Sequence, residues 1–199
     1  MKLKKLLLAT RNKDKVIEIK HVLKDLNIEI ISADAFENLP DVDEDQPTLE
    51  GNAIKKARVL FEIAGIPTVA DDTGLEVDFL NGQPGVRSSR YAGENATYED
   101  NVNKLLKALA GVPAEKRTAR FRTIVAFWDG KGVQTVEGVC EGIILDERRG
   151  HFGFGYDPVF YVPHLKKTFA EMSLEEKNKI SHRGLALKKF KELINSKMK

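Results

Sequence analysis

Residues 3–32 read LKKLLLATRNKDKVIEIKHVLKDLNIEIIS and alternate between the patterns of a strand and of a helix. Residues 3–9 end in a run of four apolar residues (6–9) and are typical of a buried strand. Apolar side chains then recur with helical spacing, which predicts a helix from about Lys13. Residues 28–31 return to the pattern of a strand. Because this strand, helix and strand alternation continues along the chain, we expect an α/β fold.

Turn and cap signals divide the rest of the chain. The acidic, Pro-containing residues 34–46 predict a loop, and Thr48 a helix N-cap. Asn81–Gly82 is a hairpin-turn signal, and residues 129–132 are expected to join an antiparallel pair, so the sheet should be mixed. Ser173 has the spacing of a capping box. Further strands are expected at residues 67–70, 76–79, 121–128, 133–145 and 159–162, and further helices after Thr48, over residues 97–109, after Ser173 and from about Ser181.

Composition limits the class of protein. The 32 basic and 30 acidic residues leave a formal charge of only +2, so we expect no nucleic-acid partner and no membrane surface. Cys140 is the only cysteine, which excludes an internal disulfide and a zinc site with two cysteine ligands. The apolar run before Thr10 is too short for a signal peptide, and no run approaches the roughly 18 residues that span a bilayer. These features favour the cytoplasm.

A candidate anion site lies where the first strand ends and the first helix begins. Thr10 and Asn12 supply neutral donors, and Lys15 supplies a positive charge. Free backbone N–H groups and the helix dipole favour phosphate at such a position. The alternative is a capped helix start exposed to solvent, and without the glycines of a Walker A loop both interpretations stay open.

Carboxylates form a second candidate site. Glu50 is expected in the first turn of a helix, and Asp71 and Asp72 follow an apolar strand. Such oxygen ligands suit Mg²⁺, which commonly binds one or two carboxylates together with substrate phosphates. The sequence Asp-Asp-Thr-Gly is also that of a simple turn, which is the alternative interpretation.

Two later segments are candidates for binding a nucleobase. In Gly-Phe-Gly-Tyr-Asp-Pro, residues 153–158, the glycines let the backbone approach a ligand and the aromatic rings can stack on a base. A bulge or core packing is the alternative. Lys177, His182 and Arg183 concentrate donors around the start of the last helix, where a cap and a surface histidine are the simpler interpretation.

Taken in order, these motifs resemble the inosine triphosphate pyrophosphatase family, also called the noncanonical purine NTP pyrophosphatases. The resemblance extends from Thr10 to Gly184 and rests on five motifs: Thr-x-Asn-x-x-Lys (10–15), Ala-Asp-Asp-Thr-Gly-Leu (70–75), Pro-Gly-Val-x-Ser-x-Arg-Tyr (84–91), Gly-Phe-Gly-Tyr-Asp-Pro (153–158) and Ile-Ser-His-Arg-Gly (180–184).

The resemblance implies an elongated mixed β-sheet with flanking helices. Residues 1–199 would form a single domain with two lobes and a nucleotide cleft between them. Two copies of the chain would form a homodimer. The implied reaction is Mg²⁺-dependent hydrolysis of ITP, dITP and XTP to the monophosphate and pyrophosphate. Water would attack the α-phosphorus without a covalent enzyme intermediate.

The resemblance also implies a role for each matching residue. Thr10, Asn12 and Lys15 would hold the phosphates, Glu50 and Asp72 would bind Mg²⁺, and Asp72 would activate the water. Thr73, where many relatives have Ser, keeps the hydroxyl of a substrate-binding residue, and the role of Asp71 is open. Phe154 would stack on the purine, Gly155, Tyr156 and Asp157 would line its pocket, and Lys177, His182 and Arg183 would read the base. The helix start Thr-Leu-Glu-Gly-Asn departs from the family pattern at Leu49 and Gly51.

Two other functions fit the same motifs. One is a pyrophosphatase that acts on other nucleotides. The other is a nucleotide-sensing or RNA-binding module without catalysis. Carboxylates beside a phosphate loop argue against binding alone, because they repel phosphate unless a metal ion is present.

Overall fold

The computed structural model describes residues 3–198, with side chains for residues 3–196. The chain divides into two compact units. Unit 1 comprises Met1–Asp72, Thr123–Gly138 and His182–Lys199, and unit 2 comprises Thr73–Arg122 and Val139–Ser181. Strands β3 (Thr68–Val77), β5 (Thr118–Trp128) and β6 (Val133–Ile144) contribute residues to both units.

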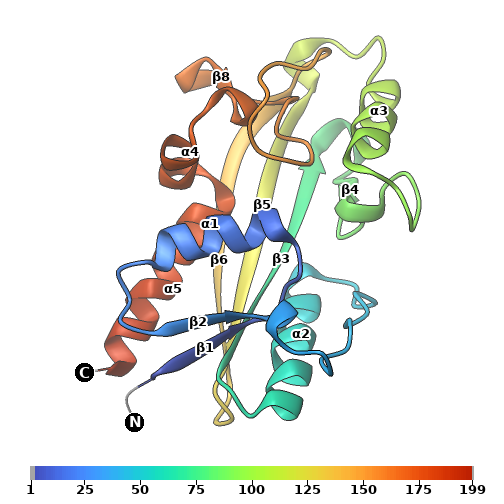
Figure 1. Cartoon of the computed structure of the whole chain (residues 1–199). Helices are drawn as coiled ribbons and strands as arrows, with labels where there is room; N and C mark the ends of the chain where they lie inside the picture. Colours follow the sequence, from blue (N-terminus) through green and yellow to red (C-terminus); the bar gives the residue numbers. More distant parts are fainter. Residues whose placement is uncertain (1–2, 199) are drawn as a thin grey trace. The chain divides into compact units, whose positions relative to one another are not determined.

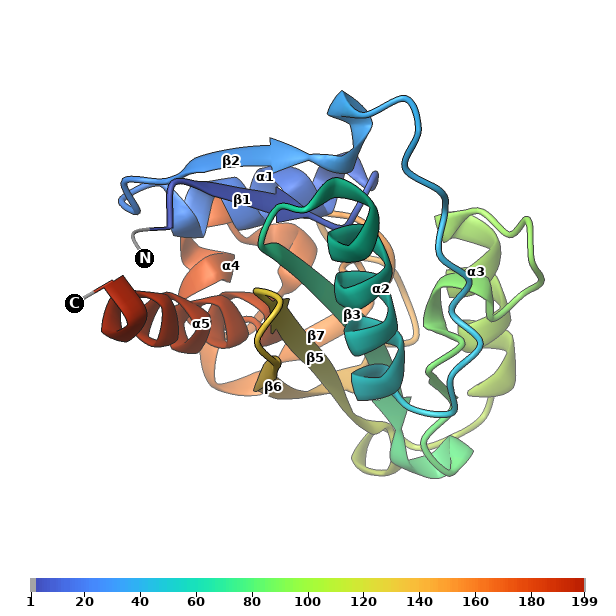
Figure 2. The ribbon, with the colours of Figure 1, turned by 90° about the horizontal axis from the view of Figure 1, so that it is seen from below.

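Unit 1 begins with the strand, helix and strand that the sequence predicts. β1 (Lys5–Leu8) pairs in parallel with β2 (Glu29–Ser32) after the crossover helix α1 (Lys13–Leu23), and β1 also pairs in parallel with β3. β1 and β2 lie side by side in Figures 1 and 2. The unit also contains α2 (Leu49–Ala64) and α5 (His182–Met198), and α5 packs on α1.

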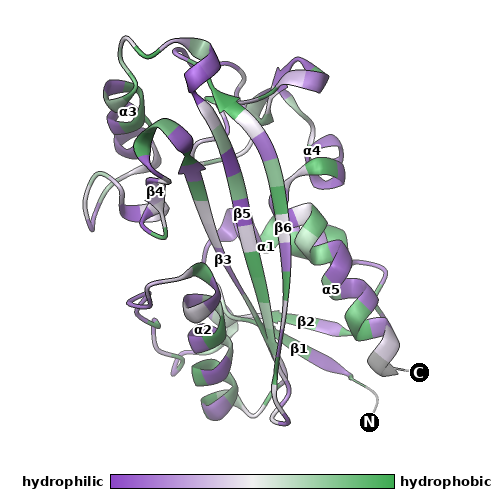
Figure 3. Ribbon diagram, turned by 180° about the vertical axis from the view of Figure 1, so that it is seen from behind, coloured by the Kyte–Doolittle hydropathy of each residue, from purple (hydrophilic) through white to green (hydrophobic). Residues whose placement is uncertain are grey.

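The core of unit 1 follows from the apolar faces of these elements. Leu6 and Leu8 of β1, Leu23 of α1 and Phe190 of α5 are all buried in one cluster. In the hydropathy colouring of Figure 3, α5 carries both hydrophobic and hydrophilic residues, as expected for a helix with one buried face. Phe190 therefore lies on the buried face of this last helix.

Unit 2 is built on antiparallel pairing. β4 (Pro84–Gly85) pairs with β3, β7 (Phe160–Val162) pairs with β6, and β8 (Lys167–Thr168) pairs with β7, each in antiparallel orientation. The sheet order is β2-β1-β3-β5-β6-β7-β8, with β4 beside β3. Because it contains parallel and antiparallel pairs, the expected mixed sheet is confirmed. Helices α3 (Tyr98–Ala108) and α4 (Leu174–Ile180) belong to this unit.

Local capping signals predicted helix starts well. Thr48 accepts a hydrogen bond from the Gly51 N–H and begins α2, and Ser173 forms the expected capping box with Glu176. The described residues also contain short 3₁₀ segments: Ala33–Ala35, Asp78–Leu80, Ser88–Arg90, Ala114–Lys116, Pro163–Leu165 and Phe169–Glu171. Among residues 3–198, no helix combines the length and apolar character needed to cross a membrane.

The turn interpretation of residues 71–74 is wrong, because β3 continues as one strand from Thr68 to Val77. Asp71 and Asp72 are both buried within it. Basic side chains from other elements compensate their charges, so the strand does not have to break to expose them. The chain turns later, at Asn81 and Gly82, which have positive φ and lead into β4.

Candidate active site

The predicted phosphate turn is a capped helix start in unit 1. The Asn12 side chain accepts hydrogen bonds from the N–H groups of Asp14 (3.0 Å) and Lys15 (3.2 Å). Thr10 Oγ1 in turn accepts from the Asn12 N–H at 3.2 Å. Two N–H groups that the sequence predicted to face phosphate are therefore bonded to Asn12. The capped-start interpretation holds for this geometry, and phosphate binding by Thr10 and Asn12 stays a prediction.

Lys15 lies against the paired aspartates of β3. Its Nζ is 3.1 Å from Asp71 Oδ2, and the same oxygen accepts from Arg183 Nε at 3.2 Å. Asp72 has other partners: its Oδ1 is 3.1 Å from Lys56 Nζ and its Oδ2 accepts from Asn52 Nδ2 at 3.2 Å. Neighbouring residues of a strand point to opposite faces, which explains the separate partners of the two aspartates.

The two carboxyl groups consequently differ in their affinity for a proton. Burial opposes charge on Asp71, but Lys15 and Arg183 hold its pKa well below the ordinary value. Burial raises the pKa of Asp72, and Lys56 offsets this effect only in part. Asp72 is therefore the better proton acceptor of the pair, while Asp71 is a permanent counter-charge for two cations.

Lys56, on the second turn of α2, is a site residue that the motifs did not indicate. Its buried Nζ donates to Glu44 Oε1 (2.6 Å), the Asp71 carbonyl (2.7 Å) and Asp72 Oδ1 (3.1 Å). Burial lowers the pKa of Lys56, but Asp72 and Glu44 reverse this effect and raise it overall. One sequence signal could have indicated Lys56. Asn52 and Lys56 are four residues apart in the expected helix, so both polar side chains lie on the same helix face.

The structure brings Glu44, rather than Glu50, to Asp72. Glu50 is exposed and accepts a hydrogen bond from Thr135 Oγ1 at 3.0 Å. Glu44 shares the Lys56 ammonium with Asp72; burial opposes its charge, but attraction to Lys56 prevails and lowers the pKa of Glu44. No group of three or more His, Cys, Asp and Glu side chains within the described residues is arranged to hold a metal ion. Metal binding by Glu50 stays a prediction.

Arg183 and His182 are buried at the start of α5. Arg183 is only 2% exposed, and it donates to Glu18 of α1 as well as to Asp71. Burial opposes its charge, but Asp71 and Glu18 raise its pKa above the ordinary value. The Arg183 guanidinium thus joins three elements of unit 1. Base reading by His182 and Arg183 stays a prediction, as does the role of the half-buried Thr73 in β3.

Unit 2 assembles the other predicted binding residues. Asp157 Oδ2 accepts from Lys177 Nζ at 2.6 Å and from the Phe154 N–H at 2.8 Å. The Lys177 ammonium also lies 5.0 Å from the centre of the half-buried Phe154 ring, within cation–π range. Tyr156 is buried and its hydroxyl donates to the Ser88 carbonyl at 2.9 Å. Phe154, Asp157 and Lys177 therefore form one group, beside which Tyr156 is anchored to Ser88.

Glycine is required at the start of this group. Gly153 has φ +73°, and a Cβ atom there would lie 2.0 Å from Asp157 Oδ2. Gly155 also has positive φ (+61°), but a Cβ atom added there would meet no atom within 4 Å beyond its chain neighbours, so space for a side chain exists. The backbone at Gly153 can approach the Asp157 carboxylate only because it has no side chain.

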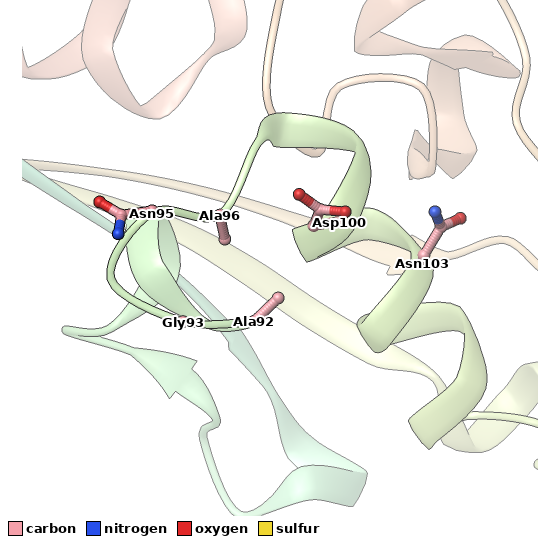
Figure 4. Close-up of a pocket in the computed structure, with 6 residues that line it drawn as sticks. All are labelled: Ala92, Gly93, Asn95, Ala96, Asp100 and Asn103. Carbon is pink, nitrogen blue, oxygen red and sulfur yellow. The ribbon is translucent and has the colours of Figure 1, made fainter.

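A separate pocket of about 460 Å³ lies in unit 2 between α3 and the preceding loop (Figure 4). It contains none of the predicted site residues. Its lining residues are Ala92, Gly93, Asn95, Ala96, Asp100 and Asn103.

Comparison with known proteins agrees with the resemblance. Two similar proteins are dITP/XTP pyrophosphatases: that of Desulforamulus reducens is 52% identical over 96% of each chain, and that of Caldanaerobacter subterraneus subsp. tengcongensis is 54% identical over 96% of each. The solved structure of a HAM1 protein from Coxiella burnetii is 41% identical, covers 97% of this chain and 99% of its own, and has a TM-score of 0.89.

The family-level match extends over most of the sequence. The model of the Ham1 family matches residues 6–193, which include every residue predicted to bind the substrate or a metal ion. The chain belongs to the Ham1 family.

Proposed function

We propose that this protein hydrolyses noncanonical purine nucleoside triphosphates, such as dITP, ITP and XTP, to the monophosphate and pyrophosphate. The observation that carries the proposal is the identity of about half the residues, over nearly the whole chain, with proteins named dITP/XTP pyrophosphatase. The buried group around Asp72 adds a chemical reason, because it combines a proton acceptor with cations suited to phosphate.

In this proposal Lys15 and Lys56 bind the triphosphate. Both ammonium groups neutralise carboxylates in the structure, at Asp71 and at Asp72 with Glu44. Their positive charge attracts a polyanion without reading the base. Thr10 and Thr73 would add neutral hydroxyl donors to the phosphates.

The charges of this group fit an added metal ion. Four carboxylates (Glu18, Glu44, Asp71 and Asp72) contact three cations (Lys15, Lys56 and Arg183), which leaves the group negative before any phosphate binds. Asp72 and Glu44, which meet at one ammonium, are the oxygen ligands that we propose for Mg²⁺. Bound Mg²⁺ would neutralise charge on the phosphates during their transfer. The exposed Glu50 is the alternative second ligand.

Asp72 is the proposed proton acceptor for the attacking water. Its pKa is raised, mainly by burial, while the carboxylate of Asp71 is held ionised by Lys15 and Arg183. A general base must be able to take a proton at the working pH, so Asp72 fits this role better than Asp71. Asn52 and Lys56 hold the two carboxylate oxygens and so fix the orientation of the base.

Recognition of the base is proposed for the group in unit 2. Phe154 offers a ring face, and Lys177 and Asp157 offer a donor and an acceptor. A 6-oxo purine accepts a hydrogen bond where adenine donates one, so ATP would leave a donor unpaired. Sites built in this way discriminate by about 10⁴ or more. His182 and Arg183 are the further candidates for reading the base.

A substrate panel tests the proposal. The protein is incubated with Mg²⁺ and dITP, ITP, XTP, GTP or ATP, and pyrophosphate and orthophosphate are assayed separately. We expect pyrophosphate from the first three nucleotides and its loss with EDTA. Orthophosphate as the first product would contradict the mechanism. Tight binding without hydrolysis would favour a nucleotide-sensing module.

The proposal also includes a homodimer and a cytoplasmic location. Light scattering on the purified protein measures its mass against the 22.3 kDa of one chain. Cell fractionation with a specific antibody tests the location.

A further inference from the structure

Residues 36–48, here called the acidic segment, form an irregular connection between the 3₁₀ turn after β2 and helix α2. Figure 2 shows this trace running from the end of β2 to the start of α2. It has no backbone ladder along its length, so its conformation depends on other contacts. Glu44, the carboxylate that shares Lys56 with Asp72, lies within it.

Arg11 holds the first half of the acidic segment. Its Nη1 donates to Asp41 Oδ1 at 2.9 Å and its Nη2 donates to the Leu39 carbonyl. Its Nε also lies 3.9 Å from Asp34 Oδ1, just before the segment. A planar guanidinium can bind a carboxylate and a carbonyl through separate N–H groups that are fixed in one plane.

Helix α2 holds the second half. Lys55 Nζ donates to the Asp43 carbonyl (2.9 Å) and to Asp45 Oδ1 (2.8 Å), on either side of Glu44. Asn52 Oδ1 accepts from the Gln46 N–H at 2.9 Å. The Glu44 carboxylate is thus delivered to Lys56 by a segment fixed from both ends.

Arg11 is the one of these anchors that lies in the predicted phosphate turn, between Thr10 and Asn12. Its guanidinium is directed to the acidic segment, and 38% of the Arg11 side chain is exposed. Lys15, in the same turn, lies against Asp71. The contacts of Arg11 instead connect the turn to the segment that carries Glu44.

We propose that Arg11 is a positioning residue, which holds the acidic segment so that Glu44 stays beside Asp72 when the site takes up its metal ion. This inference rests on the proposed function and on Glu44 and Asp72 as the metal-binding pair. Loss of Arg11 removes its contacts with the Leu39 carbonyl and with Asp41, and the Glu44 carboxylate then samples positions away from Asp72. Metal affinity falls, whereas nucleotide affinity at saturating metal changes little.

The test compares Arg11→Ala with Asp41→Asn, because the two variants separate positioning from direct phosphate binding. Asp41 is 87% exposed, so its substitution does not threaten the fold. Each variant is titrated with Mg²⁺ in a calorimeter, without nucleotide. The affinity for Mg²⁺ should be weakened about tenfold in Arg11→Ala and less in Asp41→Asn. The double variant should match Arg11→Ala, because Asp41→Asn weakens a contact that Arg11→Ala has already removed. Arg11→Lys should restore part of the affinity.

Hydrogen exchange and steady-state kinetics complete the test. Residues 36–48 should exchange faster in both variants, and the KM for dITP at saturating Mg²⁺ should change less than about twofold. Arg58→Ala is the matched control on α2. Arg58 forms an exposed ion pair with Glu62 and lies over the Trp128 ring, and neither partner belongs to the acidic segment. This variant should leave exchange of the segment unchanged.

Two results would overturn the inference. One is a raised KM for dITP in Arg11→Ala with no such change in Asp41→Asn, which would make Arg11 a phosphate ligand. The other is unchanged exchange and unchanged Mg²⁺ affinity in both variants. Neither result touches the proposed function, which fails separately if the wild-type protein releases no pyrophosphate from dITP.

Discussion

Asp72→Asn changes one charge and almost nothing in size. In the structure Asp72 accepts from Lys56 through Oδ1 and from Asn52 through Oδ2. An asparagine keeps one acceptor oxygen and replaces the other with an amide donor, so one of these contacts is lost. Lys56 retains the Glu44 carboxylate and the Asp71 carbonyl. The variant should therefore fold.

The expected magnitudes follow from these contacts. Loss of one buried hydrogen bond lowers the free energy of unfolding by about 1–2 kcal/mol. In a protein of this size each kcal/mol lowers Tm by about 2–4 °C. The rate should suffer far more. Removing a general base lowers kcat by about 10²–10⁴, so kcat for dITP should fall by at least about 10².

Asp71→Asn is the matched control for this prediction. Asp71 is buried against Lys15 and Arg183, and its substitution leaves both cations without their shared carboxylate. Breaking a buried ion pair costs about 3–5 kcal/mol, so this variant should lose more stability and less kcat than Asp72→Asn.

Thermal melts and initial rates of pyrophosphate release measure both quantities for each variant. A folded Asp72→Asn variant with near-normal kcat would refute the assignment of the base. A larger loss of kcat in folded Asp71→Asn would move the role to Asp71.

Three further predictions concern binding, packing and pH. Lys15→Ala should raise the KM for dITP and ATP by a similar factor, because a phosphate contact carries no base information; a change confined to dITP would show that Lys15 is misplaced. Gly153→Ala should cost about 1–3 kcal/mol of stability, because the added Cβ meets Asp157 Oδ2 at 2.0 Å, whereas Gly155→Ala, with positive φ but open space, should melt at a higher temperature than Gly153→Ala. The pKa of Glu176 is lowered from 4.5 to about 2, first by the backbone N–H at the N-cap of α4, so its contribution to stability is present above pH 4.5 and disappears as the pH falls to about 2. The Tm difference between wild type and Glu176→Gln should shrink over that interval, and a constant difference would contradict the linkage.

Elements with local signals could be predicted from the sequence. The caps at Thr48 and Ser173 depend on side chains within three residues of the N–H groups that they bind, so the sequence contains the whole interaction. The same holds for the turn at Asn81 and Gly82. The α/β fold class required only the order of apolar periods.

The position of the Glu44 carboxylate beside Asp72 could not be predicted from local signals. Residues 36–48 have no helical or strand period, so nothing local indicates that Glu44 returns to β3. The cap at Thr48 predicted the start of α2 and, with it, Glu50 in the first helical turn. The Glu50 side chain, however, is exposed and hydrogen-bonded to Thr135. Long-range contacts such as Lys56 with Glu44 decide which acidic residue is buried, and a single sequence does not contain them.

The neighbouring aspartates show how far spatial context changes the meaning of a motif. In a turn both carboxylates would be solvated and nearly equivalent, but in a strand they face opposite sides and meet different partners. Lys15 and Arg183 keep Asp71 ionised, while burial raises the pKa of Asp72. Extending β3 through these residues therefore converts two similar side chains into a fixed counter-charge and a proton acceptor. The chemical distinction on which the proposed mechanism depends arises from the strand itself.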